Sequence, residues 1–183
     1  MKKLVPVLLS LIATATPAAA QLKVGAKAPD FTTPATLGGH EFTFSMADAL
    51  KKGPVVLYFY PAAFTPGCTV EAHEFAEAVP KFQALGATVI GVSRDRISTL
   101  DKFSVTECRS AFPVAADATG NITHSYDAVL SAFFKLADRT SYVIAPDGTI
   151  LYAYHAMDPE HHVGNTLAAV TDWAEMHKGA TRP

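Results

Sequence analysis

Pro54-Val-Val-Leu-Tyr-Phe-Tyr60 is the stretch that decides the fold, and Pro61-Ala-Ala-Phe-Thr-Pro-Gly-Cys68 follows it directly. A nearly continuous apolar run suits a strand that is buried on both faces, as in a mostly parallel sheet. Beyond the second segment, apolar residues at helical spacing predict a helix: Phe75, Val79 and Phe82. Pro80 should kink or divide that helix, because proline lacks the N–H of a helical hydrogen bond.

On either side of this unit, strand patterns alternate with helix patterns. Residues 21–36 look like an extended lead-in, and a Gly38-Gly39 turn follows them. The remaining expected segments are strands at 41–44, 87–93 and 112–115, helices at 97–108, 124–130 and 163–174, and a hairpin over 141–154 around Asp147-Gly148. This order is an α/β pattern, and it predicts one domain over residues 21–183.

Composition narrows the class of protein. The 183 residues are 49% hydrophobic and 17% charged, which is enough apolar material for a packed core. The net charge of -2 excludes generic electrostatic binding of nucleic acid. The body of the chain has no apolar run long enough to span a membrane. Two cysteines, Cys68 and Cys108, are too few for a disulfide-dense scaffold or a four-cysteine zinc site.

The first twenty residues have the pattern of a cleavable secretory signal. Lys2 and Lys3 precede a mostly apolar stretch over residues 4–12, and Ala18-Ala19-Ala20 offers a cleavage site. A membrane anchor is the alternative, although the apolar stretch is short for a bilayer. We expect residues 1–20 to be removed and the protein to be exported to a bacterial periplasm, where disulfides can persist.

Cys68 carries the chemistry that the sequence suggests. Pro66 and Gly67 place it in the first turn of the helix, where free backbone N–H groups and the helix dipole favour a negative charge. Such a position favours the thiolate, which is the nucleophilic form of cysteine. The Thr65 hydroxyl, three residues upstream, can reach the sulfur or an oxygen bound to it. The alternative is a structural cysteine buried beside a helix start.

Pro61-x-x-x-Thr65-x-x-Cys68 resembles the active-site signature of the peroxiredoxins, the AhpC/TSA-type redoxins. The wider run resembles their type Q branch, also called bacterioferritin comigratory protein. The similarity continues through Gly91-Val-Ser-Arg-Asp95, Phe112-Pro113 and the Arg139-x-Ser-Tyr-Val-Ile stretch, and covers most of residues 22–175. It implies a thioredoxin-like fold with a central mixed sheet and flanking helices.

The resemblance also implies a thiol peroxidase that needs no metal, flavin or haem. Cys68 would attack the O–O bond of hydrogen peroxide or an alkyl hydroperoxide and become a sulfenic acid. Thr65 would hydrogen-bond the thiolate and the peroxide, Pro61 would shield the sulfur from water, and Arg139 would stabilise developing negative charge. A thioredoxin-like or other dithiol reductant would supply the electrons. Because type Q proteins are often monomers, we expect a monomer.

The roles of Arg139 and Glu71 each have an alternative interpretation. Arg94 and Arg109 could play the same part on physical grounds, and the resemblance alone favours Arg139. Arg139 could instead be a surface charge at a strand entrance. Glu71 either orients the arginine or is a carboxylate on the helix surface.

Removal of the sulfenic acid is where this chain departs from its relatives. Many type Q proteins have a resolving cysteine five residues after the first, and this chain has His73 there. Cys108 is the remaining candidate, although the aligned position looks closer to Ser104. The 97–108 helix would carry Cys108 about 16 Å from its start near Cys68, beyond the ~7 Å that a disulfide allows. We expect no Cys68–Cys108 bond in the folded form. Resolution by Cys108, core packing of Cys108 and intermolecular resolution all stay open.

Four residues near the last helix could bind a soft or borderline metal ion: His155, Met157, His161 and His162. Asp158-Pro159-Glu160 favours the alternative of a solvated helix start. The second hypothesis of function is therefore a non-enzymatic, exported metal chaperone with a thioredoxin fold. Such chaperones usually have a C-x-x-x-C pair, which the Cys68 loop lacks.

Overall fold

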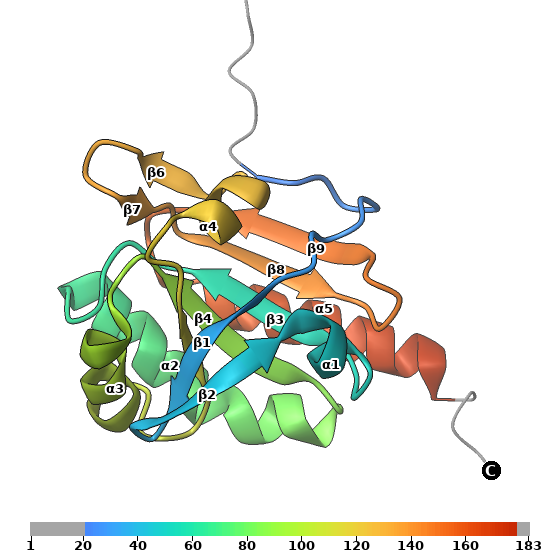
Figure 1. Cartoon of the computed structure of the whole chain (residues 1–183). Coiled ribbons are helices and arrows are strands. Elements are labelled where there is room, and N and C mark those ends of the chain that lie inside the picture. Colours follow the sequence, from blue (N-terminus) through green and yellow to red (C-terminus); the bar gives the residue numbers. More distant parts are fainter. Residues whose placement is uncertain (1–20, 179–183) are drawn as a thin grey trace, which may run out of the picture.

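The computed structural model describes residues 21–178, so the expected signal segment over residues 1–20 lies outside the described residues. Its centre is a seven-stranded sheet in the order β2-β1-β5-β4-β3-β8-β9 (Figure 1). The strands are β1 (Thr32–Leu37), β2 (His40–Ser45), β3 (Val55–Phe59), β4 (Thr88–Ser93), β5 (Val114–Ala116), β8 (Thr140–Ile144) and β9 (Ile150–His155). A separate two-stranded ribbon consists of β6 (Val129–Ser131) and β7 (Leu136–Ala137). The helices are α1 (Met46–Leu50), α2 (Pro66–Ala84), α3 (Ile97–Thr106), α4 (Asn121–Ser125) and α5 (His162–His177).

The strands of the main sheet do not all run the same way. β4 is parallel to β3 and to β5, and α2 and α3 supply the long crossovers that parallel neighbours require. The other neighbouring pairs are antiparallel. The expected thioredoxin-like arrangement, a mixed sheet with flanking helices, is confirmed. β3 is buried on both faces although the sheet as a whole is mixed, because antiparallel strands extend it on both sides of the β3–β4–β5 centre.

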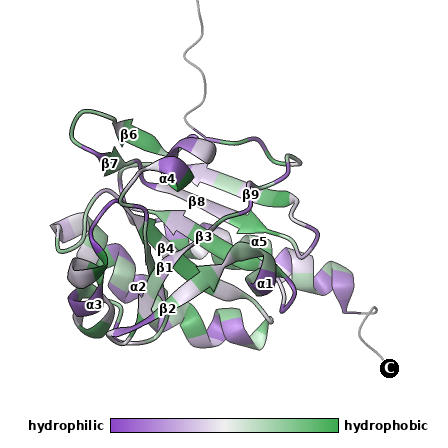
Figure 2. Cartoon of the chain, in the orientation of Figure 1, coloured by the Kyte–Doolittle hydropathy of each residue, from purple (hydrophilic) through white to green (hydrophobic). Residues whose placement is uncertain are grey.

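β3 is buried along its whole length, which confirms the prediction made from its apolar run. Alternate side chains enter two cores. Val56 and Tyr58 join the core under α2, α3 and α5, whereas Val55, Leu57 and Phe59 join the core under α1 and α4. Figure 2 shows hydrophobic residues along the central strands and alternating hydrophobic and hydrophilic residues along α2. β3 therefore lies between the two cores, and the chain leaves it directly into the loop before α2.

Two segments differ from the sequence predictions. The expected helix over 124–130 is instead α4 at Asn121–Ser125, because the Asp117 carboxylate accepts hydrogen bonds from the backbone N–H groups of Gly120 and Thr123. Asp127 then adopts a left-handed φ of 52°, and the chain turns into β6, which was not predicted. Part of the expected lead-in over 21–36 is β1, a strand paired with both β2 and β5.

α3 ends at Thr106, so Cys108 lies beyond the helix and not within the expected 97–108 helix. Arg109 and Ser110 have left-handed φ values of 51° and 54°, and the Ser110 N–H donates to the carbonyl oxygen of Ser104. This turn closes the helix end. α2, by contrast, runs through Pro80 to Ala84 as one helix, so of the two effects expected of Pro80, a kink or a division, the division is wrong. No helix among residues 21–178 is long and apolar enough to cross a membrane.

Candidate active site

The loop between β3 and α2 presents Cys68 at the start of a 19-residue helix. Thr65 is the last residue before the helix, Pro66 opens its first turn, and Cys68 lies in that turn with 1% of its surface exposed. The N–H groups of a first turn have no partners within the helix, so they favour a negative charge beside them. The place that the sequence predicted for Cys68 is confirmed.

This loop is anchored from the end of the neighbouring strand. The backbone N–H of Ala63 donates to Oδ2 of Asp95 over 2.8 Å, and the Ser93 hydroxyl donates to the same oxygen over 2.8 Å. Because β3 and β4 are parallel, their carboxyl ends meet at one edge of the sheet, and the residues after β4 can reach the loop after β3. Asp95 therefore fixes the backbone that carries the candidate catalytic residues.

Thr65 and Pro61 lie in this loop, and both are half-buried. The Thr65 hydroxyl donates to the carbonyl oxygen of Ala62 over 2.9 Å. Among residues 21–178 no hydrogen bond joins that hydroxyl to the sulfur of Cys68. Because its hydrogen is already engaged, the Thr65 oxygen has lone pairs free to accept a hydrogen bond.

Arg139 comes from the segment just before β8 and reaches the sulfur. Its Nη2 donates to Sγ of Cys68 over 3.5 Å, and its Nε donates to the carbonyl oxygen of Met157 over 2.9 Å. Its Nη1 donates to Oε2 of Glu71. The guanidinium is therefore held on three sides, and only 3% of the residue is exposed. The alternative of a surface charge does not fit this burial.

The other two candidate arginines lie elsewhere. Arg94 donates to the carbonyl oxygen of Thr119, and Arg109 forms an exposed ion pair with Glu77. Neither contact involves the sulfur of Cys68. The structure thus places Arg139, the residue favoured by the resemblance, at the site.

Glu71 lies one helical turn after Cys68 and is fully buried. Burial raises the pKa of the Glu71 carboxyl to about 8, although the neighbouring Arg139 acts in the opposite direction. Burial alone would lower the pKa of Arg139, but the carboxyl of Glu71 and the sulfur of Cys68 outweigh this effect and raise it. The arginine is therefore a permanent positive charge in a site closed to water. Of the two roles considered for Glu71, the helix-surface carboxylate does not agree with the structure.

Cys68 and Cys108 are both free and buried. Cys108 packs in the same core as Cys68, and burial raises the pKa of its thiol far above the ordinary value. The neighbouring Glu107 contacts Nε2 of His73 on α2 over 2.9 Å. The position where many type Q proteins have a resolving cysteine therefore faces the chain segment that contains Cys108.

The four candidate metal ligands near α5 do not converge. His155 contacts the Asp138 carboxylate over 2.7 Å, and His162 is fully buried between Ser141 and the carbonyl oxygen of Ala156. His161 is exposed. Within residues 21–178, no group of three or more histidine, cysteine, aspartate or glutamate side chains is arranged to hold a metal ion. The chaperone hypothesis gains no support from this geometry.

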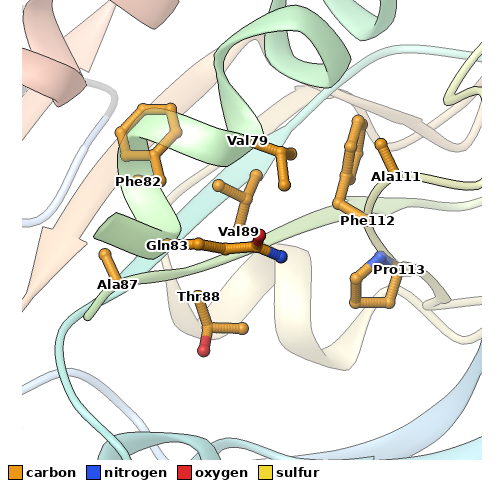
Figure 3. Close-up of a pocket in the computed structure, with 9 residues that line it drawn as sticks. All are labelled: Val79, Phe82, Gln83, Ala87, Thr88, Val89, Ala111, Phe112 and Pro113. Carbon is orange, nitrogen blue, oxygen red and sulfur yellow. The ribbon is translucent and has the colours of Figure 1, made fainter. Parts of the chain in front are cut away.

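One small cavity lies away from these residues. Figure 3 shows it between the end of α2 and the start of β4, and its volume is about 100 Å³. Val79, Phe82 and Phe112 contribute to its walls. Cys68 is at the opposite end of α2, so this cavity is not part of the site.

Comparison with known proteins shows which family has this combination of sequence and fold. The family model described as "AhpC/TSA family" matches residues 24–153. The chain belongs to the AhpC/TSA family. It is similar to a putative chloroplastic peroxiredoxin Q of Oryza sativa subsp. indica, with 33% identity over 144 residues, covering 78% of this chain and 64% of the rice protein. The chain thus spans less than two thirds of that relative's length.

Two solved structures resemble this chain in fold. Peroxidoxin BcpB from Mycobacterium tuberculosis has a TM-score of 0.75 and 30% identity, with 82% of this chain and 97% of that chain covered. The bacterioferritin comigratory protein of Xanthomonas campestris has a TM-score of 0.67 and 29% identity, with 77% and 91% covered; its title refers to alkyl peroxide reduction activity. The relatives are peroxiredoxins, and none of those described here is a metal chaperone.

Three contributors to the site escaped the sequence analysis. Asp95 anchors the loop, the backbone carbonyl of Met157 holds Arg139, and His162 lies behind Glu71. Asp95 could have been found, since it follows a buried parallel strand whose carboxyl end meets the Cys68 loop. A backbone carbonyl leaves no sequence signal. His162 was noticed only as a candidate metal ligand.

Proposed function

We propose that this chain is a thiol peroxidase that reduces hydrogen peroxide and organic hydroperoxides, with Cys68 as the attacking group. The observation that carries the proposal is the 3.5 Å hydrogen bond from Nη2 of Arg139 to Sγ of Cys68, in the first turn of α2. A guanidinium and a helix N-terminus both favour the thiolate, the reactive form of cysteine. Membership of the AhpC/TSA family supports the same reaction.

In the proposed step the Cys68 thiolate attacks the hydroxyl-bearing oxygen of the peroxide. An S–O bond forms and the O–O bond breaks, so the sulfur is oxidised to a sulfenic acid and the peroxide is reduced. The peroxide hydroxyl hydrogen stays on the sulfenic acid, and the departing oxide takes one proton from solvent to leave as water or an alcohol. Arg139 stabilises the charge on the departing oxygen. The Thr65 oxygen accepts a hydrogen bond from the peroxide hydroxyl, and Pro61 keeps bulk water from the sulfur of Cys68.

Cys108 is proposed as the residue that resolves the sulfenic acid. Once it has left the core, the Cys108 thiol would lose its proton and its sulfur would displace the sulfenic oxygen, so that the S–O bond breaks and a disulfide joins the two sulfurs. The departing oxygen takes up one proton and leaves as water. Since Cys108 is fully buried outside α3, the segment around it must open before the sulfurs can meet. A thioredoxin-like dithiol would then reduce the disulfide to two thiols.

Export and monomeric state complete the proposal. The basic start, apolar stretch and alanine-rich end of residues 1–20 support cleavage and a periplasmic location. Expression of the full chain in a Gram-negative bacterium should yield a periplasmic protein that begins near Gln21, and a full-length cytoplasmic product would contradict this. Sedimentation should give the mass of one chain.

The proposed function is tested by peroxide consumption with dithiothreitol as the reductant, using protein freed of metal ions. Cys68→Ser should abolish consumption. Cys108→Ser should leave the first reaction with peroxide intact but prolong the life of the sulfenic acid, which mass spectrometry of a trapped adduct measures. Peroxide turnover in Cys68→Ser contradicts the peroxidase, and an unchanged sulfenic acid lifetime in Cys108→Ser contradicts the resolving role.

A further inference from the structure

One carboxyl oxygen of Glu71 is not used by Arg139. Arg139 donates to Oε2, whereas Oε1 is buried and has no hydrogen-bond partner among residues 21–178. A buried carboxylate oxygen without a donor loses its hydration and gains nothing in return. Nδ1 of His162 lies 3.7 Å from this oxygen.

The contacts of the His162 ring fix where its hydrogen lies. Nε2 is 2.9 Å from the carbonyl oxygen of Ala156, which can only accept, so Nε2 carries hydrogen. Burial lowers the pKa of His162 to about 4, so the ring is neutral at pH 7. Nδ1 therefore has one lone pair, and the Ser141 hydroxyl points toward it over 2.8 Å. To accept from Glu71, Nδ1 must share this lone pair between two donors, or the hydrogen of the Ser141 hydroxyl must rotate away from it. An oxygen without a donor and a nitrogen lone pair thus face each other across the gap between Glu71 and His162.

We propose that Glu71 is a neutral carboxylic acid while Cys68 is a thiolate, with its proton on Oε1 directed toward Nδ1 of His162. In this form Oε2 is the carbonyl oxygen, which accepts from Arg139 as the structure has it. The positive charge of Arg139 then stabilises one anion, the Cys68 thiolate, and is not shared with an ionised Glu71. The inference rests on the proposed function of Cys68 and makes Glu71 and His162 positioning residues.

The charge of the buried cluster supports this assignment. When the S–H bond of Cys68 breaks and an O–H bond forms on Glu71, Arg139 faces a single negative charge both before and after. Nothing is oxidised or reduced. An ionised Glu71 beside the thiolate would instead leave one buried negative charge uncompensated, which is strongly unfavourable. The effect of burial on the Glu71 pKa, described above, acts in the same direction.

Several other ionisable groups act on this cluster from the elements packed around it. They are Glu74 on α2, His155 at the end of β9 together with its partner Asp138, and Asp158 in the loop before α5. Glu74 raises the pKa of Glu71, and Asp158 acts on His162 against the effects of Arg139 and His155. These groups surround the wild type and the variants alike, so a comparison between them isolates Glu71.

The first test compares Glu71→Gln with the wild type. Glutamine is a neutral isostere that cannot ionise, so the two proteins are compared by how the rate constant with peroxide depends on pH, and not by its size at pH 7. The wild-type rate should fall as the pH rises through about 8, because ionised Glu71 then competes for Arg139. Glu71→Gln should lack this fall. Glu77→Gln, which removes an exposed carboxylate from the same helix, should keep it.

A fall of the same size through about pH 8 in folded Glu71→Gln would overturn the inference, because this variant has no carboxyl group to ionise. Infrared difference spectra between wild type and Glu71→Gln provide the second measurement. The carbonyl stretch of a protonated carboxylic acid should be present in the wild type at pH 7 and absent in the variant. Its absence from the wild type overturns the inference even if the variant does not fold.

His162 is tested through the same band. His162→Phe removes the lone pair, so the band should shift in frequency, and His162→Asn, which keeps a polar atom near the place of Nδ1, should shift it less. An unmoved band in both variants removes His162 from the inference. Loss of turnover in Cys68→Ser tests the proposed function separately, because that result is independent of the infrared band.

Discussion

A Cβ atom on Gly67 would lie 3.1 Å from Nη2 of Arg139, so the arginine crosses α2 at a position that has no side chain. The same Nη2 donates to the sulfur of Cys68, while Glu71 and Met157 hold the rest of the guanidinium. In Gly67→Ala the guanidinium must therefore shift and weaken its bond to the sulfur. We expect the rate constant with peroxide, measured by stopped flow, to fall about fivefold, the effect of roughly 1 kcal/mol of hydrogen bonding.

Gly164→Ala is the matched control. Gly164 also lies in a helix, α5, but a Cβ there meets nothing within 4 Å. Its rate constant should equal that of the wild type, and its stability should rise by up to about 1 kcal/mol, because alanine favours helix over glycine. Equal losses of rate in the two variants would show that the Arg139 contact is not the cause.

Arg139→Lys tests the geometry of the cation rather than its charge. A lysine ammonium is a point charge on a flexible chain, so it cannot contact Cys68, Glu71 and the Met157 carbonyl together. We expect the peroxide rate constant to fall about 100-fold, as for loss of one stabilising donor. Arg109→Lys, which alters an exposed arginine paired with Glu77, should change the rate little. A fall of less than threefold in Arg139→Lys would mean that the charge of Arg139 matters and that its hydrogen-bonding geometry does not.

A histidine–carboxylate contact and an ion pair hold the residues on either side of Cys108 against α2. Glu107 contacts His73, and Arg109 contacts Glu77. If Cys108 must leave the core to reach Cys68, weakening these contacts should speed disulfide formation after oxidation. Each partly exposed pair contributes up to about 1 kcal/mol, so Glu107→Gln and Arg109→Gln should each give an increase of about two- to fivefold. Mass spectrometry of quenched samples measures the rate.

Asp48→Asn, which breaks an exposed pair with Lys51 on α1, is the control for loss of a surface charge and should leave that rate unchanged. Slower disulfide formation in Glu107→Gln would mean that the closed segment, not the opened one, brings the two cysteines together.

The central strand and the helix after it could be predicted from the sequence because the residues that they bury form local patterns. The β3 run is apolar throughout, and α2 repeats apolar residues at helical spacing. α4 was placed too late along the chain, because its start depends on Asp117, which accepts from Gly120 and Thr123. Such a side-chain contact has no periodicity. β6 and β7 are strands of three and two residues, too short for a pattern to form.

The site was predictable where its chemistry is local and unpredictable where it depends on packing. Cys68 and Thr65 share one loop and helix start, so their spacing alone indicates their proximity. Arg139 is 71 residues from Cys68 in the sequence, and physical reasoning did not distinguish it from Arg94 and Arg109. His162 resembled a metal ligand in a run of histidines, whereas the fold buries it alone behind Glu71.

His162 should also make stability depend on pH. Burial lowers its pKa to about 4 in the folded protein, below the ordinary value of 6.5, so between these values the unfolded chain binds a proton that the folded protein does not. Stability from this group is therefore complete above pH 6.5 and is lost as the pH falls toward 4. The loss is roughly 3 kcal/mol, from about 1.4 kcal/mol for each pH unit. Because His162→Gln lacks this group, its stability relative to wild type should improve by that amount over the interval.

Urea unfolding of the wild type and His162→Gln at several pH values between 4 and 7 measures this difference. His124→Gln removes an exposed histidine at the end of α4 and reports how much of the change follows from losing any histidine. Glu71 acts in the opposite direction, because its raised pKa makes the folded protein bind a proton more tightly than the unfolded chain from pH 8 down to its ordinary value of 4.5. The test therefore depends on the difference between variants and not on the wild-type curve. A difference that stays constant from pH 7 to pH 4 would mean that His162 takes up its proton equally in the folded and unfolded states, and that its ring is not held neutral behind Glu71.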